Sequence, residues 1–416
     1  MIFLLAFVSV SMDDALWISD AYVRNLANLQ AQYASGNVQV LLHLRDYRPG
    51  DTMSTLGQPY RFNLFRGLLR YDAGRWNLSL GDNDMVFGRG LSLFLSTDEK
   101  ALLESYLRGL DFAYGNFHLY GGYKRRFIYY SGDSIMQYLA GAYVGGEVTG
   151  LNLLYYADTA MRGGVATSAY LQRETDGYSI YLEGALRRGY DIRVFSENWG
   201  YGLYGSFSLY LSTFTLSLEL KDYRRLFQYF NLPAPANDYG VLSSEGRDEM
   251  GYSASVEGSH FRVSLAQDWG SGIVNLLTYY GFTYYSTGIF SYKLSIHGLN
   301  WLHNLNETVS SLEIKYSPSW GIIFDMEYRE RDSEAQPYAS IAFLLGGWTL
   351  SASSRYYATS TNLDYLLSLR YDDMRNFFVE ASYGAFSGDI VCSSGICRYE
   401  PEFRGLKLSA GYTFVK

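Results

Sequence analysis

The chain has 416 residues, a net charge of −8 at pH 7 and 17% aromatic residues, with 41 Tyr and 42 Gly. Its basic residues are scattered and form no basic stripe, which argues against a nucleic-acid partner. No run of about 18 apolar residues occurs, so no segment is expected to cross a membrane as a helix. Abundant Tyr and Gly with only 18% charged residues indicate long β-strands that have one apolar face and one polar face.

The N-terminus begins with an apolar run over residues 2–11 that ends in Ser9-Val10-Ser11. This small-x-small ending is typical of a signal-peptidase site, although the usual positively charged start is missing. We therefore predict a signal peptide over residues 1–11 and a single domain over 12–416. The alternative is that the same run forms an ordinary first strand.

Residues 80–95, LGDNDMVFGRGLSLFL, contain two motifs that resemble ligand sites. Gly88-Arg89-Gly90 is not predicted to bind a dinucleotide, because no helix follows whose N-terminus would hold a phosphate. Asp82-Asn83-Asp84 lacks the Gly and the distal Glu of a calcium loop. We interpret the segment as a strand end, a turn and a Gly-kinked entry into the next strand. If the segment dips into a lumen, Arg89 is a lumen charge.

Alternation with period two dominates the rest of the chain. In 213–221, TFTLSLELK, every second residue is apolar. Short turn signals such as Asp176-Gly177 and Gly346-Gly347 separate the runs and suit tight hairpins, and the prolines are expected between strands. The pattern recurs at 177–187, 312–317, 319–330, 362–372, 375–386 and 403–414.

Acidic and basic residues recur on the polar faces of these predicted strands. One interpretation is a solvated lumen wall in which neighbouring strands form ion-pair ladders. The other is a selectivity lining for a solute, and both can hold. The candidate lumen residues are Arg89, Glu183, Arg187, Glu219, Lys221, Glu313, Lys315, Asp325, Glu327, Arg329, Asp364, Arg370 and Glu380.

The number of alternating runs, about 22–24 with an outer range of about 18–26, is too large for one open sheet or sandwich. A closed antiparallel barrel in lipid has no edges and needs alternation in every strand. Tyr and Trp near strand ends fit the aromatic girdles of the membrane interfaces. The fold class predicted is therefore all-β, a transmembrane antiparallel up-and-down β-barrel.

Connection lengths test this topology, since external loops of such barrels are longer than periplasmic turns. Counted back from the last strand, the predicted external connections include 387–402 and 224–247, and the periplasmic ones include 346–347. In the N-terminal third, 83–105 and 127–135 are long but fall on the periplasmic side of this count. The count is then wrong by one strand, or one of these segments folds into the lumen. The external segment 226–242 either folds inward as a constriction or caps the barrel.

The cysteines and histidines offer no catalytic or metal motif. Cys392 and Cys397 are close in sequence in a predicted external loop, which favours a loop-stapling disulfide over two free thiols. A metal site would need further ligands nearby. The histidines show no H-E-x-x-H or Ser/His/Asp order, so polar lumen or loop positions are expected rather than those of an outer-membrane hydrolase; they are His43, His118, His260, His297 and His303.

The last predicted strand, RGLKLSAGYTFVK, resembles the C-terminal assembly signal of bacterial outer-membrane proteins. Tyr412 and Phe414 form the Tyr-x-Phe ending, and Val415 and Lys416 extend it by two residues. This resemblance implies recognition by the barrel assembly machinery.

A second resemblance covers about a third of the chain. The residues that carry it are LRYDAGRWNLSLGD, FGRGLSL and LRGLDF between 69 and 112, and KDYRRLFQYFN followed by RDEMGY between 221 and 252. They are similar to an uncharacterised family of bacterial outer-membrane β-barrel proteins. A weaker similarity of the first region is to substrate-specific porins. The resemblance implies a single outer-membrane barrel and no established activity.

The sequence thus predicts a barrel in the bacterial outer membrane, surrounded by membrane lipid and lipopolysaccharide. The leading function is a passive, porin-like channel for small solutes, since a barrel of this size encloses a water-filled lumen unless loops plug it. The rival functions are a structural or assembly barrel with a plugged lumen and, less favoured, an outer-membrane enzyme. No catalytic residue, cofactor or metal is predicted.

Overall fold

The structure, a computed structural model, describes most of the chain and consists of β-strands and their connections. Within the described residues no helix is long and apolar enough to cross a membrane. The described residues are 6–19, 23–48, 61–98, 103–128, 131–132, 137–191, 196–226, 230–231, 234, 236–237, 248–270, 273–301, 305–318, 320–373, 375–386, 389–393, 396–400 and 403–415.

The wall of the molecule is a closed antiparallel barrel of 24 strands in the described part of the chain. These are β1 (Ala6–Ser19), β2 (Val23–Ser35), β3 (Val38–Arg48), β4 (Arg61–Asp72), β5 (Trp76–Asn83), β9 (Leu103–Tyr114), β10 (Phe117–Ile128), β12 (Gln137–Gly145), β13 (Thr149–Asp158), β14 (Gly163–Glu174), β15 (Tyr178–Asp191), β16 (Ser196–Tyr210), β17 (Phe214–Arg224), β18 (Asp248–Gly258), β19 (Phe261–Gly270), β20 (Ile273–Ser286), β21 (Phe290–Trp301), β22 (Leu305–Tyr316), β23 (Gly321–Arg331), β24 (Glu334–Leu345), β25 (Trp348–Tyr357), β26 (Asn362–Asp372), β27 (Phe377–Phe386) and β30 (Phe403–Val415).

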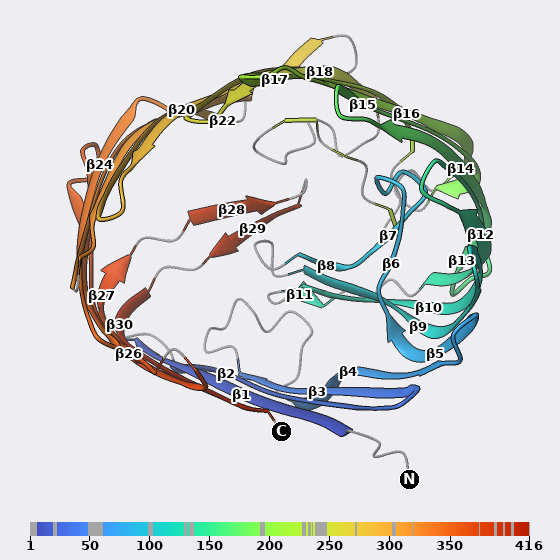
Figure 1. Cartoon of the computed structure of the whole chain (residues 1–416), viewed down its shortest axis with the longest axis horizontal. Coiled ribbons are helices and arrows are strands. Elements are labelled where there is room, and N and C mark those ends of the chain that lie inside the picture. Colours follow the sequence, from blue (N-terminus) through green and yellow to red (C-terminus); the bar gives the residue numbers. More distant parts are fainter. Residues whose placement is uncertain are drawn as a thin grey trace.

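Closure is made by the first and last strands. β1 pairs with β2 on one side and with β30 on the other, so the wall returns to its beginning (Figure 1). Every other wall strand pairs with the wall strands before and after it, and β5 pairs directly with β9. The predicted fold class and strand number are confirmed. A closed ring satisfies every backbone hydrogen bond within the wall, as lipid requires.

Alternation along each strand separates a lipid-facing surface from an inner one. In β15 the leucines at 182 and 186 are half exposed on the outside, while Tyr181 and Glu183 are buried on the inside. Aromatic rings gather on the outside next to short turns, with centroid separations of 5.4 Å for Tyr71–Trp76 and 4.9 Å for Trp348–Tyr371. Such rings are typical of a membrane interface.

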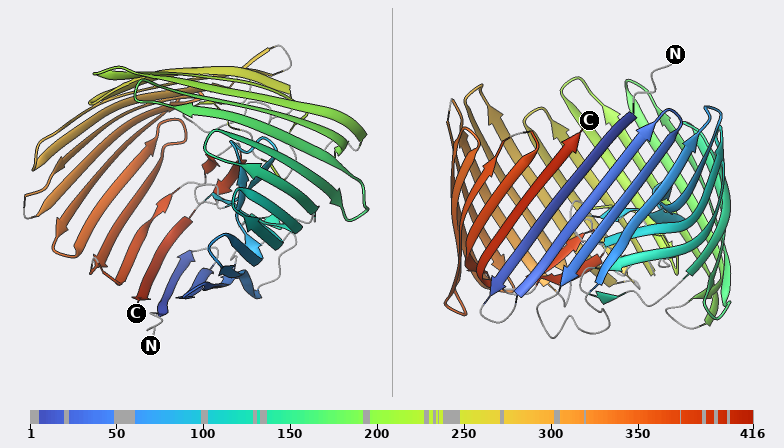
Figure 2. Two further views of the ribbon diagram at one scale, coloured as in Figure 1. Left: turned by 45° about the vertical axis from the view of Figure 1, so that its right-hand side comes forward. Right: turned by 90° about the horizontal axis from the view of Figure 1, so that it is seen from below.

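The two ends of the barrel differ in their connections. At one end, here called the short-turn end, the connections are as tight as 36–37, 115–116 and 346–347. The other, the long-connection end, includes 84–102, 129–136, 225–247 and 387–402. β1 begins and β30 ends at the short-turn end (Figure 2). In outer-membrane barrels the longer connections are usually external, so the long-connection end is expected to be the external one.

This arrangement corrects the count made for the N-terminal third. The long connections 84–102 and 129–136 leave the wall at the same end as 225–247, so the expected periplasmic placement is wrong by one strand. The one-strand error lies between residues 137 and 224, where the wall has the six strands β12–β17. The second explanation also holds, because part of 84–102 lies inside the barrel, where β6 (Met85–Phe87), β7 (Leu93–Leu95) and β8 (Thr97–Asp98) are found (Figure 1).

Three further expectations concern the strands themselves. Ala6–Ser19 forms β1, so the described part of the predicted signal peptide belongs to the wall in this structure; its cleavage stays a prediction. Tyr412 and Phe414 share the outer, exposed face of β30, as the alternation predicted. Pro337 contradicts the expectation for prolines, since it lies within β24. It is tolerated there because pairing with β25 begins only at Tyr338.

Candidate functional site: the barrel lumen

A hairpin between β5 and β9 folds into the lumen and is the main feature of the site. Its two short strands, β6 and β7, pair with each other through residues 85–87 and 93–95. Gly88 and Gly90 turn the chain between them with φ of 58° and 84°, a region that favours glycine. The Gly-Arg-Gly motif is therefore the turn of an inward hairpin, called the lumen hairpin below (residues 84–96).

Glu183 holds the tip of the lumen hairpin from the barrel wall. Its Oε2 atom accepts hydrogen bonds from the backbone N–H of Arg89 at 2.6 Å and from the Tyr181 hydroxyl at 2.7 Å. A Cβ atom on Gly88 would lie 2.5 Å from the same Oε2 atom. The guanidinium of Arg89 lies 5.3 Å above the Tyr181 ring. A buried carboxylate thus caps the glycine turn at close range, and a larger residue at position 88 would have to displace it.

A chain of buried polar groups holds the second strand of the hairpin. The Ser92 hydroxyl lies 2.6 Å from that of Ser168 and accepts from Asn152 Nδ2 at 2.8 Å. Asn152 Oδ1 in turn accepts from the Tyr120 hydroxyl at 2.9 Å. These groups come from β10, β13 and β14, so the hairpin is bonded to several strands of one side of the wall.

Apolar packing fills the space between the hairpin and this side of the wall. The described residues of the connection 225–247 join it, because Phe230 O accepts from Phe94 N at 2.8 Å and Asn231 Nδ2 donates to Leu91 O at 2.7 Å. The part of 226–242 that the structure describes therefore folds inward rather than capping the barrel. One cluster consists of Met85, Phe87, Leu93, Leu95, Leu107, Tyr120, Leu139, Leu154, Tyr156, Ala166 and Phe230, and a second of Leu91, Tyr181, Ala185, Tyr204, Tyr223, Leu226 and Ala236.

Arg187 anchors the beginning of the 225–247 connection. Its guanidinium donates to Arg225 O at 2.8 Å and to the Tyr156 hydroxyl at 3.0 Å, and it contacts the Asn198 side chain. The side chain is fully buried. A guanidinium with this many acceptors fixes the position of the chain and is shielded from water in the lumen.

A buried charge cluster lies on the inner face of β17–β19. Lys221 Nζ is 2.9 Å from Glu249 Oε1 and 2.9 Å from Asp268 Oδ2, and all three side chains are buried. Two carboxylates around one ammonium satisfy the charges that burial would otherwise make costly. Next to it, the Tyr223 hydroxyl donates to Ala234 O at 2.8 Å.

The base of the lumen hairpin is fixed by a further ion pair. Arg108 Nε donates to Asp82 Oδ1 at 2.8 Å, and Asp82 Oδ2 accepts from Gly67 N at 2.9 Å. Asp84 pairs with Arg66. The Asp-Asn-Asp motif thus joins β4, β5 and β9 through arginine and backbone N–H groups. Among the described residues, no three His, Cys, Asp or Glu side chains converge as metal ligands would.

The opposite side of the wall, β22–β27, presents partly exposed charges to the lumen. Glu327 is the centre, with Arg355 at 3.0 Å and Arg329 at 3.3 Å. Arg329 also lies 3.7 Å from Glu307. Arg331 lies 4.0 Å from the same Glu307 carboxylate. On the neighbouring strands, Arg370 lies 3.6 Å from Glu380 and 2.8 Å from Asp372. The name lumen ladder is used below for these charged residues, which are Glu307, Glu327, Arg329, Arg331, Arg355, Arg370, Asp372 and Glu380.

The structure divides the predicted lumen residues into two groups. Glu183, Arg187 and Lys221 are buried on the side of the wall that the hairpin and the described residues of the 225–247 connection cover, and Glu219 faces inward beside them. The other residues keep contact with the lumen. Those are Arg89 at the hairpin tip, Glu313 and Lys315 on β22, Asp325, Glu327 and Arg329 on β23, Asp364 and Arg370 on β26, and Glu380 on β27.

The cysteines lie in a hairpin of their own, whereas His297 is close enough to Glu307, Glu327 and Arg329 of the lumen ladder to interact with them electrostatically. Cys392 is directly opposite Cys397 in the hairpin of β28 (Asp389–Ser393) and β29 (Ile396–Glu400), a backbone register that suits a disulfide. The disulfide itself stays a prediction. His118 stacks on Tyr143 at 4.2 Å, and His303 lies outside the described residues.

Several lumen residues were missed by the sequence analysis. Glu307, Arg331 and Arg355 belong to the lumen ladder, and Glu249 and Asp268 to the buried cluster. Each occupies a position that the alternation of its strand assigns to the polar face, so the alternation could have identified it. Their charge partners lie on neighbouring strands, and the register between strands that brings them together is not contained in the sequence of one strand.

Comparison with known proteins finds likeness in structure but not in sequence. No family model and no curated protein matches the chain. A chain of the E. coli P pilus tip assembly intermediate PapC-PapD-PapK-PapG is 10% identical and has a TM-score of 0.57, over 98% of this chain and 60% of that one. OpdK of Pseudomonas aeruginosa, solved with vanillate, is 11% identical with a TM-score of 0.43, over 99% of each chain. OccAB2 of Acinetobacter baumannii is 10% identical with a TM-score of 0.44, over 99% of this chain and 98% of that one.

At these identities the likeness shows the fold alone. The fold is that of a bacterial outer-membrane β-barrel, with the closed wall and apolar outer band that a membrane requires. Its architecture is porin-like, with a polar inner wall and an inward-folded hairpin.

Proposed function

We propose that the chain is a passive channel that conducts small solutes across the outer membrane. The observation that supports this most directly is the lumen ladder, since arginines and carboxylates remain partly exposed on the inner face of β22–β27. If this part of the lumen were packed with protein, apolar side chains would be expected there, as on the side that the lumen hairpin covers. Fixed charges of both signs suit a water-filled path that discriminates between ions.

The lumen hairpin is proposed to narrow this path without closing it. Its anchors lie on β10–β15, so it covers one side of the wall and leaves the ladder side uncovered by its clusters. A constriction next to a charged wall selects solutes by size and charge together. Enzymatic turnover is not part of this proposal.

The second candidate is a structural or assembly barrel whose lumen is plugged. The observation that favours it is the extent of burial, since the hairpin and Leu226, Phe230 and Ala236 contribute to two apolar clusters in the lumen. The two functions differ in whether the wild-type protein conducts. Membership of the uncharacterised barrel family, recognition of Tyr412 and Phe414 by the assembly machinery, and contact with lipopolysaccharide also remain proposals.

Single-channel recording of the refolded protein in planar bilayers tests the proposal. The wild-type protein is expected to give discrete conductance steps. A variant in which residues 86–94 are replaced by a short Gly-Ser link is expected to give larger steps, because the constriction is removed. Steps only in the replacement variant would establish the plugged barrel instead, and no steps in either protein would exclude a pore of any kind.

A further inference from the structure

A groove of about 650 Å³ opens on the outside of the wall at the long-connection end of β13–β16. Two arginines and three aromatic residues dominate its lining, which consists of Tyr155, Met161, Arg162, Gly163, Gly164, Val165, Arg188, Gly189, Tyr190, Glu197, Asn198 and Trp199. It belongs to neither the lumen hairpin nor the lumen ladder. If the long-connection end is external, the groove lies at the level of the outer-leaflet headgroups.

Arg162 is held in position by its own turn. Asp158 accepts from Arg162 N and Nε, both at 2.9 Å, and the Arg162 guanidinium donates to the Tyr190 hydroxyl at 2.7 Å. The same guanidinium lies 4.4 Å above the Tyr190 ring. Even so, half of the Arg162 side chain is exposed. The group is therefore fixed in orientation while donor positions remain open to the outside.

Arg188 provides the second cation of the groove. It is exposed, faces outward opposite Val165 and Trp199, and lies 5.0 Å above the Trp199 ring. Tyr190, whose ring and hydroxyl contact Arg162, lies two residues beyond Arg188 on the same face of β15. Guanidinium groups held on aromatic rings present parallel N–H donors, the geometry that matches phosphate.

The acidic residues of the groove set a limit on its anion affinity. Asp158 is occupied by Arg162 and its turn. Glu197 is exposed and pairs with Tyr190 across the strands, so its carboxylate would repel an anion bound in the groove. A site of this composition depends on directed hydrogen bonds more than on net charge, which distinguishes it from a general basic patch.

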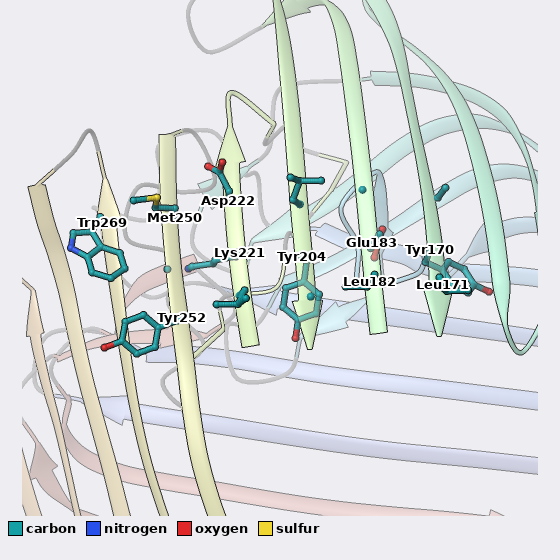
Figure 3. A pocket seen from close by; sticks show the side chains of 16 residues that line it. Tyr170, Leu171, Leu182, Glu183, Tyr204, Lys221, Asp222, Met250, Tyr252 and Trp269 are labelled. Carbon is teal, nitrogen blue, oxygen red and sulfur yellow. The ribbon is translucent and has the colours of Figure 1, made fainter. Parts of the chain in front are cut away.

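An apolar depression of about 810 Å³ continues the groove down the same outer face (Figure 3). Gly184 and Gly205 remove side chains from the centre of this surface, and Leu182 and Leu203 lie beside them with 50% and 56% of their surface exposed. Between the groove and the depression, Leu186 pairs with Tyr201 on β15 and β16. An apolar path therefore leads from the cationic groove toward the centre of the membrane.

We propose that this outer face of β13–β18 binds one molecule of lipopolysaccharide. Arg162 and Arg188 hydrogen-bond a phosphate of its glucosamine headgroup, and an acyl chain lies across Gly184 and Gly205. The combination identifies this occupant, because a phosphate site at the external rim sits directly above a chain-sized apolar depression. The inference goes beyond solute conduction and rests on the long-connection end being external.

Native mass spectrometry of the detergent-purified barrel with diphosphoryl lipid A tests the site. The double variant Arg162→Gln/Arg188→Gln is expected to bind lipid A roughly tenfold more weakly, since charge-assisted bonds to phosphate are lost. Gly205→Leu, which fills the depression and leaves both arginines, is expected to weaken it as well. Glu197→Gln is expected to strengthen it.

Arg173→Gln is the matched control, because Arg173 is an exposed residue of the same β14 strand at the short-turn end. It is expected to bind lipid A like the wild type, and all variants should keep the heat-modifiable gel mobility of a folded barrel. Equal lipid A binding by the double variant and the wild type would refute the site. Equal binding of phosphatidylglycerol and lipid A by the wild type would refute lipopolysaccharide as its occupant. Conductance is expected to be unchanged in the double variant, so a failure here is distinguishable from a failure of the channel proposal.

Discussion

Gly88 shows how strictly a single position is constrained in the lumen. It combines a φ of 58° with a wall carboxylate in contact distance, so an added methyl group would strain the backbone and would have to displace the Glu183 carboxylate. Gly115 separates the backbone strain from the steric clash. It has nearly the same φ, 55°, but no atom lies within 4 Å of an added Cβ.

Gly88→Ala is expected to displace the lumen hairpin and to raise single-channel conductance. The left-handed backbone alone costs an alanine about 1–2 kcal/mol, and the contact with Glu183 Oε2 adds to this. Gly115→Ala carries the same backbone strain in an open turn and should leave conductance at the wild-type value. Equal conductance of both variants would show that the hairpin tip does not limit the path.

Arg355 offers a test of charge at the opposite wall. Arg355→Gln removes a cation 3.0 Å from Glu327, so the carboxylate becomes less compensated. The ratio of cation to anion permeability is expected to rise roughly twofold, as fixed wall charges set ion selectivity. Reversal potentials in a salt gradient measure it, with the outward-facing Arg173→Gln as the control. An unchanged reversal potential in Arg355→Gln would remove the ladder from the conduction path.

At the scale of elements, the hairpin of β28 and β29 carries the only cysteines of the chain. Their opposed register brings the two Cα atoms to the separation that a disulfide bridges. The protein purified without reductant is expected to resist a thiol-alkylating reagent until it is unfolded and reduced. Labelling of the unfolded, unreduced protein would show two free thiols instead, and Cys392→Ser provides the single-thiol standard.

The strands were predictable from sequence to the extent that they obey a local rule. Period-two alternation is a property of neighbouring residues, so segments such as 213–221 and 362–372 could be recognised without knowing their partners. The lumen hairpin has no such rule. Its glycines signal a turn, but whether the turn points to water or to the lumen depends on Glu183 and Ser168, which are distant in sequence.

In the candidate site, too, some features follow from local sequence and others depend on residues distant in the chain. Parity along a strand could place Glu327 and Arg329 on the inner face, whereas their partners Arg355 and Glu307 depend on the register between strands. The burial of Glu183, Arg187 and Lys221 could not be predicted either. Alternation places them on the inner face in the same way as the charged residues that remain exposed to the lumen. What covers them is another part of the chain, which local sequence does not specify.

For the whole molecule, closure between β1 and β30 is the decisive feature, and it can be tested in the Cys392→Ser/Cys397→Ser background. Ala15 pairs with Ser409, so Ala15→Cys/Ser409→Cys is expected to form a disulfide that closes the ring. Ala15→Cys combined with Thr413→Cys is four residues out of register, about 13 Å along the strand, and should form none. A link in the second pair would contradict the register.

The same cysteine-pair design tests whether residues 1–11 are removed from the mature protein. Ser11 pairs with Thr413, so Ser11→Cys/Thr413→Cys closes the ring only if residue 11 remains in the mature protein. If the predicted signal peptide over 1–11 is removed, this pair forms no link while Ala15→Cys/Ser409→Cys still does. Mass spectrometry of the intact mature protein provides the independent measurement.

The lumen hairpin also imposes an order on folding. Arg89 is bonded to Glu183, 94 residues later in the chain, and Leu91 to Asn231, 140 residues later. Neither bond can form until those downstream segments are in place, so the hairpin docks after much of the wall has assembled. Phe87 and Leu93 are covered earlier, by strands that carry Tyr143, Leu154 and Tyr170, and the interval before those strands are in place is when a periplasmic chaperone would have most to protect.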